Sequence, residues 1–242
     1  MKKQVKENLS KLFVVVAVAI ISTGAVFAQK PNRSVNNREQ FSRLAREQAQ
    51  TKLKTLADQG SAANRGAVTL ANGTNFNLGK DFAMAVFDAE GIDEDEESYN
   101  YTILNLVFLI DSLEGQPEAV QLQKTLKSVV RFTSDAATVK KEIEAVSKTY
   151  LARQKVDGKW YFNAGQASMN LMISTYMGED AQIKKGLAEL QALIKVAPKN
   201  TPKEIINPIN SLAQYAAKTA YTEADYTAIY ESLESVMEAV SA

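Results

Sequence analysis

The 242-residue sequence contains no cysteine and no histidine. The chain therefore has no disulfide, no thiol nucleophile, no imidazole base and no Cys/His ligand for zinc or haem. A Gly-rich phosphate loop, a serine nucleophile elbow, an HExxH motif and a dinucleotide fingerprint are also absent. Carboxylates, hydroxyls and lysine amines are the chemical groups that remain, so we predict no bound cofactor and favour a role without catalysis.

An excess of charge of one sign is also missing, since 28 Lys and Arg residues balance 28 Asp and Glu residues. Hydrophobic residues make up 45% of the chain and charged residues 23%, which are ordinary values for a globular protein. This composition excludes wholesale disorder and a multi-span membrane protein, and we expect no nucleic-acid partner.

The first 28 residues have the anatomy of a secretory signal peptide. Lysines precede the ten-residue apolar run Leu12 to Ile21, and small residues lead to Val26-Phe27-Ala28. We predict cleavage after Ala28 and export to the periplasm or the outside of the cell. An uncleaved anchor is the weaker alternative because a bilayer span takes about 20 apolar residues, so stable membrane insertion after cleavage is not expected.

The remaining sequence is typical of an all-α protein. Residues 29–37 are polar and expected to be disordered, and residues 38–242 are predicted to form one all-α domain of about eight or nine helices. Apolar residues recur at helical spacing, and no alternating run of strand length appears. Two strong helix starts are Thr201-Pro202-Lys203-Glu204 and Thr222-Glu223-Ala224-Asp225, each with an acid three residues after a threonine.

Three local predictions concern the fold. Residues 60–79 are rich in Gly, Ala, Asn and Thr and indicate a long loop before a short helix at 81–90. Residues 99–113 are apolar nearly all round and should form the most buried helix. Asp157-Gly158 indicates a tight turn before the aromatic run Trp160-Tyr161-Phe162, which either stacks on a ligand or plugs one end of the bundle.

A faint internal similarity recurs at an offset of 64 to 65 residues; for example, Tyr150 matches Tyr215. If it reflects a repeat, residues 99–155 and 163–219 are tandem three-helix units. Chance similarity between amphipathic helices is the alternative.

The charges form blocks of alternating sign. Residues 30–65 hold eight basic and three acidic side chains, and residues 81–123 hold eleven acidic and no basic ones. Residues 124–218 hold fifteen basic and eight acidic side chains, and residues 219–242 hold five acidic and no basic ones. The blocks either neutralise one another within the bundle or form a polarised surface that docks a charged partner.

The densest charge cluster is Asp93-Glu94-Asp95-Glu96-Glu97. Its alternate carboxylates Asp93, Asp95 and Glu97 resemble the start of a calcium loop, because Ca²⁺ takes several oxygen ligands. The rest of such a loop is absent, with Ser98 at its sixth position and Leu104 at its twelfth. We favour the alternative, in which these acids charge the N-terminus of the helix that follows.

Residues 38–57 predict an amphipathic helix, with Phe41, Leu44 and Leu53 on its apolar side. Arg43, Arg46 and Lys54 fall on the opposite side and are candidates for binding an anionic surface such as lipid or polysaccharide. Because the apolar side is rich in alanine and has no tryptophan, docking on the rest of the bundle is favoured over surface binding.

These features favour an exported, non-enzymatic helical protein that acts by binding or assembly in the cell envelope or outside the cell. Its partner would be a protein or another envelope component. One alternative is a carboxylate-dependent enzyme that acts on cell-wall glycan, with two carboxylates as its catalytic groups. The other is a lipid-associating or anionic-surface factor that uses the 38–57 helix.

Overall fold

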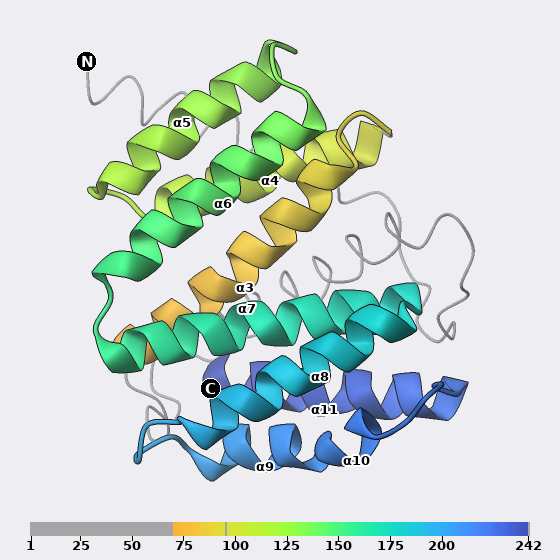
Figure 1. The fold of residues 1–242 in the computed structure, drawn as a ribbon. Helices are drawn as coiled ribbons and strands as arrows, with labels where there is room; N and C mark the ends of the chain where they lie inside the picture. Colours follow the sequence, from red (N-terminus) through yellow and green to blue (C-terminus); the bar gives the residue numbers. More distant parts are fainter. Residues whose placement is uncertain (1–69, 95, 242) are drawn as a thin grey trace, which may run out of the picture. The chain divides into compact units, whose positions relative to one another are not determined.

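A computed structural model describes residues 70–94 and 96–241 of the chain (Figure 1). The predicted signal peptide 1–28, the segment 29–37 and the helix 38–57 with Arg43, Arg46 and Lys54 lie outside the described residues. Those predictions therefore stay predictions.

The predicted all-α class is confirmed, since the described residues form nine helical segments and no strand. The segments are α3 (Leu70–Glu90), α4 (Glu96–Ser112), α5 (Pro117–Val130), α6 (Ala136–Arg153), α7 (Val156–Met177), α8 (Asp180–Lys195), α9 (Lys203–Ser211), α10 (Ala213–Ala216) and α11 (Glu223–Ser241). None of them combines the length and the hydropathy that a bilayer span requires.

The helices pack as two successive four-helix units. In the first unit α3, α4, α5 and α6 follow one another as packed neighbours, and α6 returns to pack on α3. In the second unit α7, α8, the α9–α10 pair and α11 do the same, and α11 returns to α7. Each unit has its own hydrophobic core, and the most extensive contact between helices joins α3 to α7 (Figure 1).

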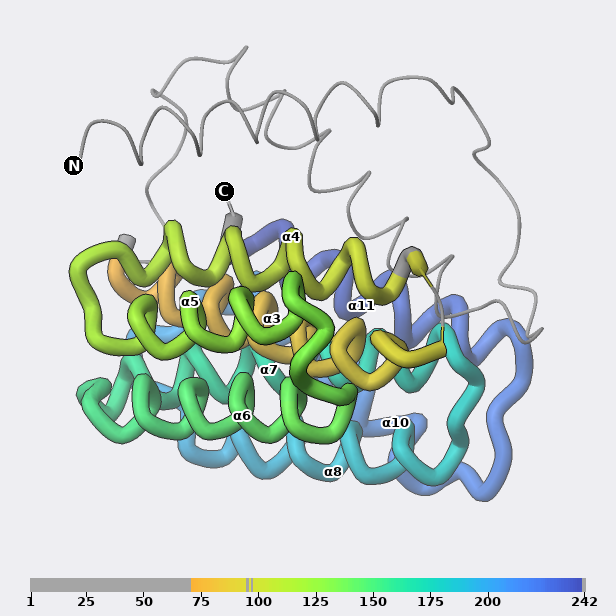
Figure 2. Tube along the Cα trace, turned by 90° about the horizontal axis from the view of Figure 1, so that it is seen from above, coloured from red at the N-terminus to blue at the C-terminus, as the bar shows by residue number. Residues whose placement is uncertain are grey.

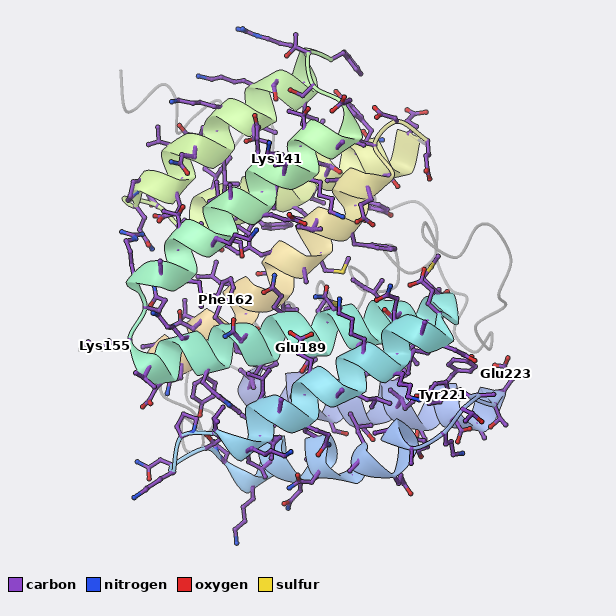
Figure 3. All side chains as sticks on the ribbon, in the orientation of Figure 1. Lys141, Lys155, Phe162, Glu189, Tyr221 and Glu223 are labelled. Atoms are coloured by element: carbon purple, nitrogen blue, oxygen red, sulfur yellow. The ribbon has the colours of Figure 1, made fainter. Side chains whose placement is uncertain are left out.

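The α3–α7 crossing exchanges a phenylalanine between the two cores. Phe76 of α3 belongs to the core of the second unit, while Phe162 of α7 belongs to the core of the first. Figure 3 labels Phe162 on α7. The centroid of its ring lies 5.9 Å from that of Phe82 and 5.6 Å from that of Tyr150. Both exchanged side chains are fully buried, so each helix helps to fill the core of the other unit.

Two glycines bring the crossing helices into backbone contact. A Cβ added at Gly79 would lie 2.0 Å from the carbonyl oxygen of Phe162, and one added at Gly165 would lie 2.0 Å from that of Phe76. Real Cβ atoms do not approach so closely, and glycine is the residue that lets two backbones meet. The contact is reciprocal, because each glycine faces the phenylalanine three residues before the other glycine.

The same four-residue pattern, Phe-Asn-X-Gly, carries both halves of this contact. It occurs at 76–79 and again at 162–165, which is 86 residues later. The helix packing groups the described chain into 70–153 and 156–241. The predicted repeat of 99–155 in 163–219 has other bounds and stays a prediction.

Several local predictions were wrong. Residues 70–79 of the predicted 60–79 loop are the first half of α3. Asp157 and Gly158 form no turn, since both lie in the first turn of α7, and the following Trp160, Tyr161 and Phe162 are buried within that helix. Packing against the neighbouring unit has overridden the weak helix propensity of glycine and asparagine in both places.

The most buried helix is α7 rather than the predicted 99–113 segment, now part of α4. Leu106 and Leu109 of α4 are fully buried, but Phe108 is 41% exposed and Leu104 and Val107 are only half-buried. An apolar helix here covers its core with one side only, and its outer side remains apolar.

Of the two predicted capping boxes, one is confirmed. The hydroxyl of Thr222 accepts a hydrogen bond from the amide of Asp225, and Asp225 in turn accepts one from the amide of Thr222 at 2.9 Å. The box at 201–204 does not form, because α9 begins after Pro202 without a side-chain cap.

We predict that Gly79→Ala and Gly165→Ala each destabilise the protein by roughly 3 kcal/mol, because the new methyl group forces α3 and α7 apart. Chemical denaturation of each variant measures the free energy of unfolding. Gly73→Ala in α3 is the matched control, since a Cβ added there would lie 3.6 Å from its nearest neighbour, the carbonyl oxygen of Val240. The control should gain a few tenths of a kcal/mol to about 1 kcal/mol from helix propensity. Equal changes in the free energy of unfolding of all three variants would contradict the role of Gly79 and Gly165 in the α3–α7 contact.

Candidate functional site

The described surface contains a hollow of about 590 Å³ at one end of the first unit. It opens between the α3–α4 turn and the α5–α6 connection. Its lining residues are Ile92, Asp93, Glu94, Glu96, Tyr99, Asn100, Val129, Phe132 and Ser134. Acidic side chains thus surround an aromatic pair, which is the composition of a site for a cationic and partly apolar ligand.

Phe132 is the least ordinary residue in this hollow. Its side chain is 79% exposed, and its ring stacks on Tyr99 with a centroid distance of 5.1 Å and an interplanar angle of 8°. Its φ of 55° is the one positive value of a non-glycine residue within the described part of the chain. Left-handed backbone costs an L-residue roughly 1–2 kcal/mol, and an exposed phenylalanine ring recovers little of that cost by burial.

The local reason for this backbone is the way in which α5 ends. The amide of Phe132 donates to the carbonyl oxygen of Val129, and the amide of Thr133 donates to that of Ser128. This is the Schellman arrangement, in which the left-handed position is usually glycine. Helix α7 ends with the same pair of hydrogen bonds and has Gly178 there, with a φ of 71°. The hollow therefore has a phenylalanine where the same turn elsewhere in the chain has a glycine.

Two caps hold the rim of the hollow in place. The carboxylate of Asp93 accepts a hydrogen bond of 2.9 Å from the amide of Ala136, across the hollow. Asp135 caps the same helix by accepting a hydrogen bond from the amide of Thr138. Hydrogen bonds from Thr138 hold the pKa of Asp135 below its ordinary value. The two loops are therefore tied to one helix start, so the hollow is preorganised.

The predicted acidic cluster borders this hollow, but only part of it is described. Asp93, Glu94 and Glu96 lie at the rim, whereas Asp95 and the side chain of Glu97 lie outside the described residues. Among the described residues no group of three acidic side chains is placed to hold a metal ion. The Asp93, Asp95 and Glu97 calcium site stays a prediction. Asp93 caps the start of α6, not the start of α4, which is the helix whose N-terminus we expected the cluster to charge.

The corresponding corner of the second unit, between the α7–α8 turn and the α10–α11 connection, is filled. The Tyr226 hydroxyl donates a hydrogen bond to Asp180, and its ring lies 6.0 Å from that of Tyr221. Both tyrosine side chains are buried. Equivalent corners of the two units thus differ: the second is closed by its own aromatic side chains, and the first presents them to solvent.

A charged network completes that closed corner. The Lys218 ammonium donates to Asp225 over 2.6 Å, and the backbone and hydroxyl groups of Thr222 donate to the same carboxylate. The hydrogen bond from Lys218, followed by that from the Thr222 amide, lowers the pKa of Asp225 to about 2. These neighbours keep the carboxylate ionised, and it forms part of the capping box at the start of α11.

A second polar cluster lies where α5 begins and α6 ends. The fully buried carboxylate of Glu118 pairs with Arg153, which also donates to Gln116 over 3.1 Å. The nearby Tyr150 hydroxyl donates to Asn75 of α3. Arg153 is 45% exposed, but loss of its guanidinium would leave the buried Glu118 carboxylate without its charged partner, which is costly. The cluster therefore helps to fix α3, α5 and α6 against one another.

The aromatic run Trp160-Tyr161-Phe162 does not form a binding surface. Trp160 donates its indole hydrogen bond to the carbonyl oxygen of Leu193 in α8, and the Tyr161 ring packs edge-on against it at 4.9 Å. All three side chains pack within the fold, which agrees with the structural alternative but places them in a helix rather than in a loop.

Sequence reasoning found the acidic rim but missed Tyr99 and Phe132. One sequence signal could have found Phe132. It follows the end of α5 and precedes Asp135, which caps α6, and a helix end of this kind usually has glycine at that position. Comparisons of the chain with protein-family models, curated proteins and solved structures find no significant match.

We predict that Phe132→Gly is more stable than Phe132→Ala by about 1 kcal/mol, because glycine adopts the left-handed backbone without strain. Thermal or chemical denaturation of the two variants measures the difference. At Val196, which is similarly exposed, the glycine variant should be no more stable than the alanine variant. An alanine variant as stable as the glycine variant would mean that the backbone at 132 is not strained.

We also predict that the Lys218–Asp225 network stabilises the fold in a pH-dependent manner. The pKa of Asp225 is lowered in the folded state to about 2, so the stabilisation is present above the ordinary aspartate pKa near 3.9. It is lost as pH falls from there toward 2. Asp225→Asn should reduce stability at neutral pH and flatten the pH dependence between about 4 and 2, measured by thermal unfolding. An unchanged pH profile would contradict this role.

Proposed function

We propose that this protein is an exported, non-enzymatic helical binding protein, and that the acidic and aromatic hollow is where it docks a partner. The observation that carries the proposal is Phe132, whose strained backbone and 79% exposed ring stand above the acidic rim. Strain of this kind persists where the fold holds a residue for a purpose, and binding sites are such places. The stacking on Tyr99 leaves most of the Phe132 side chain in solvent, where a partner can contact it.

The composition of the hollow defines the class of partner. Asp93, Glu94 and Glu96 supply negative charge on one side, and the stacked Tyr99 and Phe132 rings supply an apolar surface. A protein segment that carries Lys or Arg beside an apolar residue satisfies both, with cation–π contact to the rings. Aromatic anchors of this kind typically account for 2 kcal/mol or more of binding free energy.

The predicted export of the protein supports a binding role in the cell envelope or outside the cell. The lysines before Leu12–Ile21 and the Val26-Phe27-Ala28 sequence provide the signal, and the absence of cysteine makes folding independent of the redox state of the compartment. We therefore propose that the mature chain starts at Gln29 and works in the periplasm or outside the cell.

The glycan-hydrolase alternative requires two carboxylates that face each other across a cleft, one of them with a raised pKa. The hydrogen-bonded carboxylates Asp180 and Asp225 are engaged by Tyr226 and by Lys218 with Thr222. These contacts favour a structural role for both. The surface-binding alternative depends on Arg43, Arg46 and Lys54, and it is addressed by the experiment on residues 38–57 below.

We predict that partner capture from an envelope extract falls with rising salt and falls at least tenfold in Phe132→Ala, which removes the aromatic anchor. Glu94→Gln/Glu96→Gln should weaken capture and reduce its salt dependence. Matched controls are Val196→Ala, an exposed apolar residue of the other unit, and Glu142→Gln/Glu189→Gln, two exposed acids away from the hollow.

Capture that is equal in the hollow variants and in the controls at every salt concentration would remove the hollow from the proposed function. Turnover of peptidoglycan by the purified protein, abolished by replacement of one Asp or Glu, would instead establish the enzymatic alternative.

We predict that the exported protein begins at Gln29, because cleavage follows Ala28. N-terminal sequencing of the protein from the periplasmic or culture fraction measures this directly. Recovery of the intact N-terminus in a membrane fraction would show that residues 12–21 act as an anchor.

A further inference from the structure

The outer side of α4 is an apolar surface that neither core uses. Leu106 and Leu109 point into the first core, whereas Leu104 and Val107 belong to neither core of the described residues. Both are half-buried. A helix with apolar side chains on both sides is the pattern of a helix with a neighbour on each side.

The two helices on this side of the molecule carry acidic side chains and no basic ones. Helices α4 and α11 lie toward one side of α3 and α7, and α6 and α8 lie toward the other (Figures 1 and 2). Neither α4 nor α11 contains a Lys or Arg residue, and α11 alone carries Glu231, Glu234 and Glu238 among its acids. The opposite side is rich in lysine, as in α6 and α8. The described part of the chain is thus polarised across its thickness.

One segment of the chain has the complementary character. Residues 30–65 carry eight basic and three acidic side chains, and residues 38–57 have an apolar stripe that includes Leu44, Ala49 and Leu53. At about 100° per residue, Lys52 falls inside this stripe, whereas Arg43 falls on the opposite side. The segment therefore has an apolar side with a lysine among its apolar residues.

The covalent connection allows the segment to reach this surface. Twelve residues separate position 57 from Leu70, the first residue of α3, and α3 packs on α4. A chain of that length spans up to about 40 Å, which exceeds the roughly 25 Å length of a 17-residue helix such as α4. Because the tether is short, its effective concentration at the surface is high and favours docking within one molecule.

We propose that residues 38–57 of the same chain dock along the outer side of α4, facing α11, with their apolar stripe on Leu104 and Val107. Lys52 then lies within the contact, close enough to reach acidic side chains at its edge, Arg43 points away from the contact, and Arg46 lies at its border. Leu104 and Val107 do not line the hollow at Phe132, so variants at these positions test this proposal apart from the proposed function. The segment acts as a built-in cover for the acidic side rather than as a membrane-binding arm.

The absence of cysteine makes the contact directly testable, because an engineered pair forms the one available disulfide. Ala49→Cys/Leu104→Cys in the mature chain should form an intramolecular disulfide under mild oxidation, seen as a faster band on a non-reducing gel. Ala49→Cys/Val120→Cys is the matched control, since Val120 is exposed on α5. Adding Lys52→Glu should slow the first cross-link severalfold, as should high salt, whereas adding Arg43→Glu should not.

Equal cross-linking of the two pairs, or none at position 104, would overturn the proposal. A disulfide-linked dimer as the main product would also overturn it, by showing that the segment docks on a second copy. Val107→Cys replaces Leu104→Cys if the latter does not fold. Tryptic cleavage of the unmodified mature chain gives an independent readout: slow cleavage at Lys52 supports docking, and cleavage there as fast as at Arg33 contradicts it.

Discussion

The backbone contact between α3 and α7 is the interaction on which the rest of the structure depends. Gly79 and Gly165 let the two helices approach so closely that an added methyl group on either would overlap a carbonyl oxygen of the other. This proximity carries Phe76 and Phe162 into each other's cores. Two four-helix units that would each have a small core thereby share their largest side chains, which joins them into one packed body.

This shared scaffold explains how an unfavourable backbone is tolerated at Phe132. The α5–α6 connection is fixed by Schellman hydrogen bonds and by the Asp93 and Asp135 caps, so the strain is distributed over a firmly held loop. The second unit offers an internal comparison, because its equivalent corner is closed by the buried Tyr221 and Tyr226. The contrast between two corners of one fold supports a binding role for the open one.

The sequence predicted the amphipathic helices α5, α6, α8 and α11 well, because their apolar residues recur on one side. Their starts also carry local signals: Pro117 opens α5, Asp180 lies in the first turn of α8, and Asp135 and Thr222 cap α6 and α11. It failed at α3 and at the start of α7, where Gly and Asn indicate a loop or a turn by local propensity. In both places glycine lies in the packed contact between the two units, Gly79 against Phe162 and Gly158 against Asn75. A tertiary contact of this kind has no local signature, although the repeated Phe-Asn-X-Gly pattern was visible in the sequence.

The candidate site was predicted in part for the same reason. Its acidic rim is a local run of charge and could be read directly. The stacking of Phe132 on Tyr99 depends on a left-handed residue at a helix end, where local rules predict glycine rather than phenylalanine. Sequence reasoning finds such a residue only as an exception to the rule.

Native-state hydrogen exchange measured for every backbone amide tests most directly whether the α3–α7 crossing makes the two units one body. The account predicts that amides of α3 around Gly79 and of α7 around Gly165 exchange most slowly. It also predicts that both units share the same opening free energy, because opening one unit removes a phenylalanine from the core of the other. Two different opening free energies, with the amides of one unit exchanging while those of the other stay protected, would contradict this central claim.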